Sequence, residues 1–164
     1  MTATISVLFV SFAIWSGWQV WTSTRGETLE VSGISMQPTL NPGDKVRLVT
    51  EPDRPYRQGD LVAVSFKTRE RMMVKRIIAL EGDEVHWRDG QVFVNGRPLV
   101  MDGWPEDRRI PERSWRVLGI QLKNYGNRVP KNNVIVMGDN TSKSYDSGDF
   151  GMLSMSQLSG HVNP

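Results

Sequence analysis

The chain has 164 residues and a formal net charge of +2, and 38% of its residues are hydrophobic. This length and composition suit one globular domain with a short appendage, and they exclude a disordered chain. The absence of cysteine excludes disulfides, thiolate metal sites and cysteine nucleophiles, and the only histidines, His86 and His161, are far apart in the sequence. We therefore expect no metal and no cofactor. No basic run alternates with aromatic residues, so we expect no nucleic-acid partner either.

Residues 4–21, TISVLFVSFAIWSGWQVW, contain no ionisable side chain, and the first charged side chain is Arg25. About 20 residues cross the hydrocarbon core of a bilayer, so this run is near the lower limit. Three tryptophans gather toward its C-terminal end, as in an interfacial aromatic belt: Trp15, Trp18 and Trp21. A cleavable signal peptide would start with basic residues, which MTATIS lacks, and so long an uncharged run argues against a buried core helix. We predict a membrane anchor in residues 1–25 and a separate domain in residues 26–164.

From Glu30 onward the pattern is typical of short strands separated by turns. The expected strands are rich in Val, Ile and Leu and cover residues 45–49, 60–66, 72–80, 84–94 and 133–138. Asp89-Gly90 lies between two alternating runs and predicts a hairpin within 84–94. Residues 101–130 are polar and rich in Arg, Pro and Gly, so we expect a surface excursion between core strands. The sequence predicts a mostly-β domain with closed or partly closed sheets.

The segment SGISMQPTL, residues 32–40, combines turn residues with apolar ones. Serine, glycine and proline favour a loop, in which Ser35 would be an ordinary turn residue. The apolar side chains of Ile34, Met36 and Leu40 also fit an apolar surface around a nucleophilic serine. A serine hydroxyl is a poor nucleophile until a base takes its proton, so the choice depends on a base elsewhere in the chain.

With histidine scarce, a lysine is the candidate base. A free lysine has a pKa of about 10.4 and is protonated at neutral pH, but full burial lowers that pKa by up to about 3–5 units. Lys75 interrupts the apolar strand MMVKRIIAL, and side chains alternate along a strand, so Lys75 and Arg76 must point to opposite faces. Lysine can lose its charge and arginine cannot. Lys75 is therefore either a solvent-facing strand residue or a desolvated base, and we expect Arg76→Lys to be tolerated far better than Lys75→Arg.

A third segment, GDNTSKSYDSGDFG at residues 138–151, is dense in Asp, Asn, Ser and Gly. By itself it fits an Asx-rich turn or a calcium-binding loop. The EF-hand spacing is absent, because no glutamate closes a twelve-residue loop. A loop of hydroxyls and carboxylates after the strand at 133–138 could instead orient a serine and a lysine.

These three segments, in this order behind an N-terminal anchor, resemble the type I signal peptidases, membrane-bound Ser-Lys proteases that include the mitochondrial inner-membrane peptidases. The first segment is similar to the family's G-x-S-M-x-P-T, RQGDLVAV to its G-D-[IL]-V strand, and VKRIIALEGDEV to its K-R-[IV]-x-x-x-x-G-D. The third is similar to G-D-N-x-x-x-S-x-D-S. The resemblance runs from about residue 4 to about residue 161 and rests on four motifs in order together with the anchor.

The resemblance implies a role for four side chains. Ser35 resembles the nucleophile and Lys75 the general base, a variant of the triad logic. Ser144 resembles the hydroxyl that orients the lysine amine, and Asp146 a carboxylate that supports the site. The Ser35 N–H would be one oxyanion donor.

The resemblance also implies the substrate and the location. An extended signal-peptide-bearing preprotein would lie beside the site strands, and small residues would occupy the first and third positions before the cut, the Ala-x-Ala pattern. Val31, Met36 and Val74 flank the serine and lysine in sequence and are the expected lining. The family's topology implies one membrane span, with the domain on the outer face of a bacterial cytoplasmic membrane or, alternatively, in the mitochondrial inner membrane.

The chain departs from the family at three positions, and two other functions remain open. Thr141 and Gly148 stand where many members have basic residues, which leaves an ion pair to Asp146 without its partner, and Gly33 stands where some bacterial members have a serine. Self-cleaving repressors of the SOS type share the G-x-S-M and V-K-R segments, although residues 4–21 hold no helix-turn-helix. A non-enzymatic, membrane-anchored β-domain that binds a partner is the other alternative.

Overall fold

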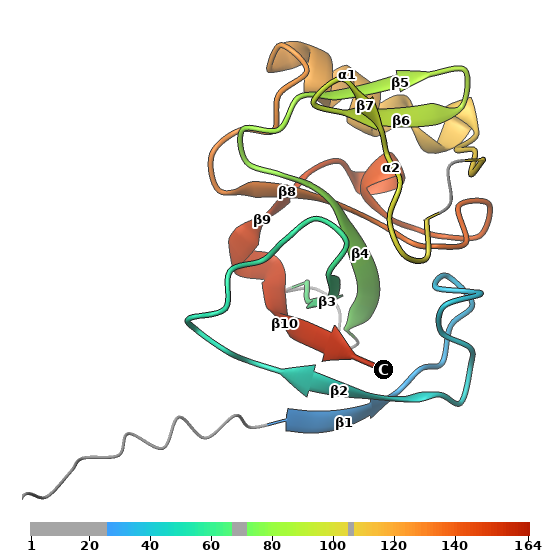
Figure 1. Ribbon diagram of the computed structural model, residues 1–164, viewed down its shortest axis with the longest axis vertical. Coiled ribbons are helices and arrows are strands. Elements are labelled where there is room, and N and C mark those ends of the chain that lie inside the picture. Colours follow the sequence, from blue (N-terminus) through green and yellow to red (C-terminus); the bar gives the residue numbers. More distant parts are fainter. Residues whose placement is uncertain (1–25, 67–71, 105–106) are drawn as a thin grey trace, which may run out of the picture.

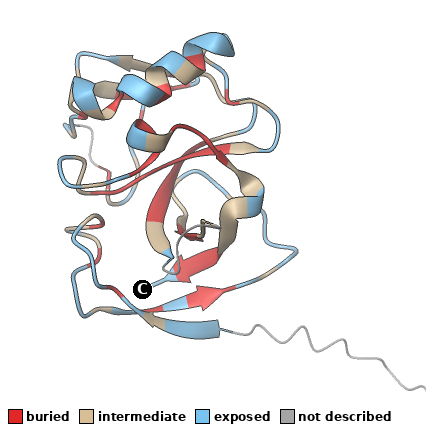
Figure 2. Ribbon diagram, turned by 180° about the vertical axis from the view of Figure 1, so that it is seen from behind, coloured by how far each residue is buried: buried red, intermediate tan, exposed pale blue. Residues whose placement is uncertain are grey.

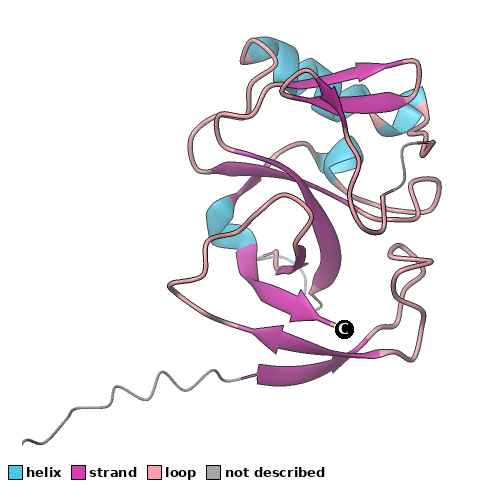
Figure 3. Cartoon of the chain, viewed as in Figure 1, coloured by secondary structure: helices cyan, strands magenta, loops and turns pink. Residues whose placement is uncertain are grey.

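The computed structural model describes residues 26–66, 72–104 and 107–164, and these form ten strands and four short helices. The strands are β1 (Gly26–Glu30), β2 (Lys45–Val49), β3 (Leu61–Val64), β4 (Met73–Leu80), β5 (Val85–Arg88), β6 (Gln91–Val94), β7 (Arg97–Pro98), β8 (Asn133–Met137), β9 (Leu153–Ser154) and β10 (Leu158–Asn163). The helices are the 3-10 turns η1 (Glu112–Ser114) and η2 (Met155–Gln157), α1 (Arg116–Asn124) and α2 (Ser147–Phe150). The mostly-β prediction is confirmed (Figure 3).

The strands form one large and one small antiparallel sheet. The large sheet has the order β1-β2-β10-β3-β4-β8-β9, and the small one has the order β5-β6-β7. In Figure 1 the small sheet lies at the top beside α1, and β4 runs from the lower part of the molecule up toward it. Each predicted strand region contains strand, and the hairpin between β5 and β6 turns at Asp89 and Gly90, with φ of 49° and 82°. Positive φ at both central residues is what a type I′ turn requires.

Strand β4 is the element that positions the site. It lies between β3 and β8, and five consecutive residues, 75–79, are buried (Figure 2). A strand on the surface of a domain would expose every second side chain, but both faces of β4 are covered. Any polar side chain on this strand must therefore find its partners inside the protein.

The prediction that residues 101–130 form a surface excursion is wrong for residues 110–122. Helix α1 buries Leu118 and Leu122, and Trp115 and Ile110 belong to the same hydrophobic cluster. Residues four apart lie on one face of a helix, so two leucines suffice to anchor a helix whose other positions are exposed or half-buried. The average composition of the segment concealed this narrow apolar stripe.

The predicted anchor, residues 4–21, lies outside the described residues. Within 26–66, 72–104 and 107–164, no helix is long and apolar enough to cross a membrane.

Candidate active site

Ser35 begins a turn that follows β1 and spans residues 35–39. The Leu40 N–H donates to the Met36 carbonyl at 2.9 Å, and the Gln37 N–H donates to the Ile34 carbonyl at 3.2 Å. Met36 and Leu40 are each only 2% exposed, because their side chains insert into the cluster beneath the turn. The apolar residues of this segment thus hold the turn in place, and Ser35 sits half-buried at its start.

Lys75 reaches this turn from β4, where it pairs with Val62 of β3. The side chain is 2% exposed, and Nζ donates a hydrogen bond to Ser35 Oγ at 2.8 Å. Burial lowers the pKa of Lys75, because the charged ammonium loses its hydration, and the negative charges of Asp146, Asp139 and Asp149 oppose the shift. Lys75 therefore has the burial and the contact with a hydroxyl that a desolvated base requires. It does not face solvent, so the alternative of an ordinary surface lysine on a strand is excluded.

Arg76 points to the opposite face of β4, as predicted, but it too is buried, with 5% exposed. Its Nε and Nη2 donate to the two carboxylate oxygens of Asp139 at 2.8 and 2.7 Å, and its Nη1 donates to the Gly59 carbonyl at 2.8 Å. A lysine could not supply this fork of donors, and the expectation that Arg76→Lys is tolerated far better than Lys75→Arg stays a prediction. The pairing also neutralises Asp139, which would otherwise favour a charged Lys75 more strongly.

Asp146 supports the loop that follows β8. One of its oxygens accepts from the Gly138 N–H at 3.0 Å, and the other accepts from the Gly148 N–H at 3.1 Å at the start of α2. These backbone donors satisfy the carboxylate without a basic partner. A side chain at Gly148 is also excluded, because a Cβ there would lie 1.7 Å from the Ser114 carbonyl oxygen. The departure from the family pattern at position 148 therefore has a steric reason.

Ser144 lies near the site without the predicted hydrogen bond to Lys75. Its Oγ is buried and has no hydrogen-bond partner among the described residues. A Cβ added to Gly138 would lie 2.3 Å from Ser144 Oγ and 2.5 Å from the Ser35 carbonyl oxygen, so the three residues meet closely at Gly138. The role of Ser144 as the group that orients the lysine stays a prediction.

Val31, Met36 and Val74 are brought together in one hydrophobic cluster beside Ser35. Met36 is almost fully buried and serves the packing of the turn, whereas Val74 is half-buried and keeps part of its side chain at the surface. The position of these residues agrees with the predicted lining. Their contact with a substrate stays a prediction.

Two connections between the first and third segments were missed in the sequence. The Asn140 N–H donates to the Ser35 carbonyl at 2.9 Å, and the Asn140 side chain donates to the Ile34 carbonyl at 3.2 Å. The Thr39 hydroxyl donates to Asp139. Each of these residues lies within a segment matched to the family, but nothing in their spacing indicates that they meet.

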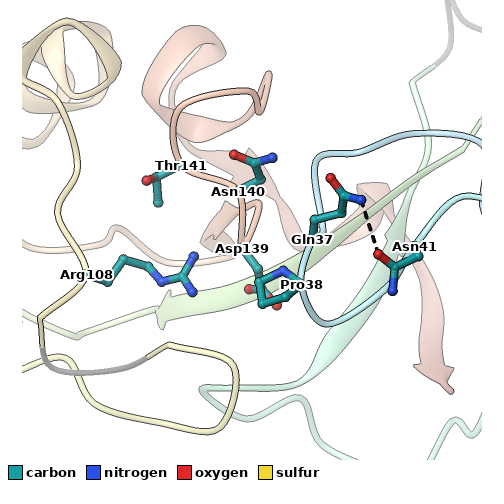
Figure 4. Close-up of a pocket in the computed structure, with 7 residues that line it drawn as sticks. All are labelled: Gln37, Pro38, Asn41, Arg108, Asp139, Asn140 and Thr141. Carbon is teal, nitrogen blue, oxygen red and sulfur yellow. Dashed lines mark hydrogen bonds between the residues drawn. The ribbon is translucent and has the colours of Figure 1, made fainter.

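A pocket of about 460 Å³ lies next to the turn at residues 35–39 (Figure 4). Its lining is mostly polar and comes from three parts of the chain: Gln37, Pro38, Asn41, Arg108, Asp139, Asn140 and Thr141. No cluster of three or more His, Asp or Glu residues that could hold a metal ion occurs in the part of the chain that the structure describes.

Comparison with known proteins finds similarity to signal peptidases. The model of the family described as "Signal peptidase, peptidase S26" matches residues 1–164. Signal peptidase I of Bacillus licheniformis is 32% identical over 139 residues, which cover 79% of this chain and 70% of that protein. Signal peptidase IB of Staphylococcus aureus (strain COL) is 30% identical over 143 residues, which cover 81% of this chain and 73% of that protein.

The matches also include a protein named as inactive. Inactive signal peptidase IA of Staphylococcus aureus (strain MRSA252) is 30% identical over 131 residues, covering 78% of this chain and 71% of that protein. A crystal structure of a signal peptidase I from Enterococcus faecalis V583 has 22% sequence identity and a TM-score of 0.46, and the match covers 66% of this chain and 97% of that chain. Activity in this chain thus has to be argued from its own residues.

Proposed function

The chain belongs to the peptidase S26 family of signal peptidases, and on that premise we propose that it is a membrane-bound serine endopeptidase. It removes N-terminal signal peptides from exported preproteins, with Ser35 as the nucleophile and Lys75 as the general base. The observation that carries this proposal is the 2.8 Å contact between Ser35 Oγ and the buried Nζ of Lys75. Some relatives are named inactive, but this chain has both a hydroxyl and a desolvated amine within proton-transfer distance.

The proposed reaction begins with Lys75 neutral. Its lone pair accepts the Ser35 proton as Oγ attacks the scissile carbonyl carbon, and the Ser35 N–H stabilises the oxyanion. The resulting ammonium then gives its proton to the departing amine, leaving an ester on Ser35. Lys75, neutral again, takes a proton from water as the water oxygen attacks the ester carbon. When the bond to Ser35 Oγ breaks, the Lys75 ammonium returns that proton to Oγ, which releases the signal peptide as a carboxylic acid and restores the Ser35 hydroxyl. The 2.8 Å separation suits both proton transfers.

The proposed specificity follows from the apolar cluster beside Ser35. A preprotein would lie extended along residues 31–33 and the start of β4, with its small side chains against Val31, Val74 and the edge of Met36. A Cβ built on Gly33 would meet no atom within 4 Å, so this side of the turn is open. Limited space between valines and a buried methionine favours alanine at the first and third positions before the cut.

The proposed location rests on the uncharged run at 4–21. One span there would tether the domain to a lipid bilayer, on the outer face of a bacterial cytoplasmic membrane, with the mitochondrial inner membrane as the alternative. Protease added to spheroplasts should digest residues 30–164 if this topology is correct. Full protection of the domain would contradict it.

The test of the function compares purified wild-type protein in detergent with Ser35→Ala, using a preprotein that carries an Ala-x-Ala site. Wild type should release the signal peptide, and a folded Ser35→Ala protein should release none. Cleavage of the chain itself with no cleavage of the preprotein would instead favour a self-cleaving repressor-like protein. Equal cleavage by both proteins would eliminate Ser35 as the nucleophile.

A further inference from the structure

The polar pocket beside the turn at residues 35–39 is lined by one arginine and one aspartate, and the aspartate is already paired elsewhere. Asp139 is the acidic residue of its lining, and both of its carboxylate oxygens already accept hydrogen bonds from Arg76. Arg108 lines the same pocket and forms no ion pair with any carboxylate in the described ranges. Within those ranges, no carboxylate neutralises its guanidinium.

Arg108 is held in place by an aromatic ring. Its guanidinium carbon lies 5.3 Å from the centroid of the Trp104 ring, and its Nε is buried with no hydrogen-bond partner among the described residues. Figure 4 shows the side chain extended from its loop toward Asp139 and Pro38. A cation stacked on an aromatic ring keeps its orientation while its outer N–H groups remain free for a planar anion such as a carboxylate.

The turn that begins at Ser35 borders both the pocket and the apolar cluster. Met36 and Leu40 pack in the cluster that includes Val74, whereas Gln37 and Asn41 of the same turn line the pocket. A polypeptide whose scissile bond lies at Ser35 must continue in both directions. Small residues before the cut suit the apolar side, so the residues after the cut meet the polar side.

Resting on the function proposed above, we propose that this pocket is the subsite for the first residues after the cut and that Arg108 selects a carboxylate side chain there. The substrates it favours are preproteins whose mature part begins with an acidic residue within its first three positions. Arg108 is thus a specificity-determining residue, whose contribution depends on the charge of the substrate.

The test uses peptides that share one Ala-x-Ala sequence and differ in a single residue, Asp, Asn or Lys, at position one, two or three after the cut. At one of these positions we expect kcat/KM for Asp to exceed that for Asn by about fivefold, the upper range for a partly exposed ion pair. Lys should be cleaved more slowly than Asn. Arg108→Gln should abolish the preference, and Arg108→Glu should reverse it. Arg109→Gln, an equal change of charge at the exposed next residue, should leave it intact.

Failure of this inference is distinguishable from failure of the proposed function. Equal rates for Asp, Asn and Lys at all three positions would overturn the inference and leave the function standing. Absence of any cleavage would remove the function, and the pocket is then tested by binding of the same fluorescently labelled peptides to Ser35→Ala. Binding that favours Asp and loses this preference in the Ser35→Ala, Arg108→Gln protein supports the acidic subsite. Binding that does not depend on charge overturns it.

Discussion

Replacing Lys75 by arginine keeps a positive charge in the site but removes the ability to accept a proton. An arginine side chain stays protonated across the whole working pH range, whereas even an ordinary lysine is neutral in about one molecule in 250 at pH 8. Burial lowers the pKa of Lys75 below its ordinary value of 10.5 and increases its neutral fraction further. Loss of a general base costs about 10²–10⁴-fold in rate, so Lys75→Arg should reduce kcat/KM by at least about 10²-fold.

The lowered pKa of Lys75 also predicts how the cleavage rate changes with pH. Below the lowered pKa, Lys75 is protonated and cannot act as a base; above it, the amine is neutral and active. The rate should therefore rise with pH and level off below the ordinary lysine value of 10.5. The assay is kcat/KM for an Ala-x-Ala peptide between pH 6 and about 10.5, with Lys75→His included because imidazole is a base that could retain a trace of activity.

Lys45→Arg is the matched control, because Lys45 is an exposed strand lysine. It should have wild-type activity and the wild-type pH profile. Circular dichroism and thermal unfolding establish that Lys75→Arg is folded. Near-normal activity of folded Lys75→Arg, or a profile without an ionisation below the ordinary lysine value, would refute the Ser-Lys reasoning even if Ser35 proved essential.

Three further predictions concern the supporting structure and the specificity. Arg76→Lys loses the two-pronged contact with Asp139 and should lower the free energy of unfolding by about 1–3 kcal/mol, measured by urea unfolding; an unchanged midpoint would show that the fork is not needed. Leu118→Ala should cost about 2–5 kcal/mol, because Leu118 is 0% exposed in the α1 core, and Val117→Ala on the exposed face should cost far less. Replacing alanine by leucine at the position before the cut should reduce kcat/KM at least about tenfold, or about 1.4 kcal/mol; equal rates would rule out a small pocket at Val31 and Val74.

Much of the strand pattern was readable from the sequence, since strands and turns are local features. The Val- and Ile-rich runs each contain a strand, and Asp89-Gly90 marks the hairpin turn. Alternation along β4 correctly predicted that Lys75 and Arg76 point to opposite faces. The lack of cysteine and the two distant histidines made a serine and a lysine the candidates, and the resemblance to the type I signal peptidases singled out Ser35 and Lys75.

The short or irregular elements were not readable, because their burial comes from their neighbours. Strand β10, LSGHVN, has a polar sequence but lies between β2 and β3, and α1 is anchored by two leucines within a polar segment. The amino-acid compositions of β10 and α1 therefore indicate neither their secondary structure nor their burial.

The environment of the site was decided by the tertiary structure alone. A sequence states that two cations are adjacent on a strand, but only the covering of both faces of β4 shows that both are buried and need separate partners. Lys75 meets Ser35 across 40 positions of sequence, and Arg76 meets Asp139 across 63. Burial and partner choice are long-range properties, because they depend on which segments the fold packs together, and it is these properties that lower the pKa of Lys75 and bring Arg108 into the pocket beside the turn.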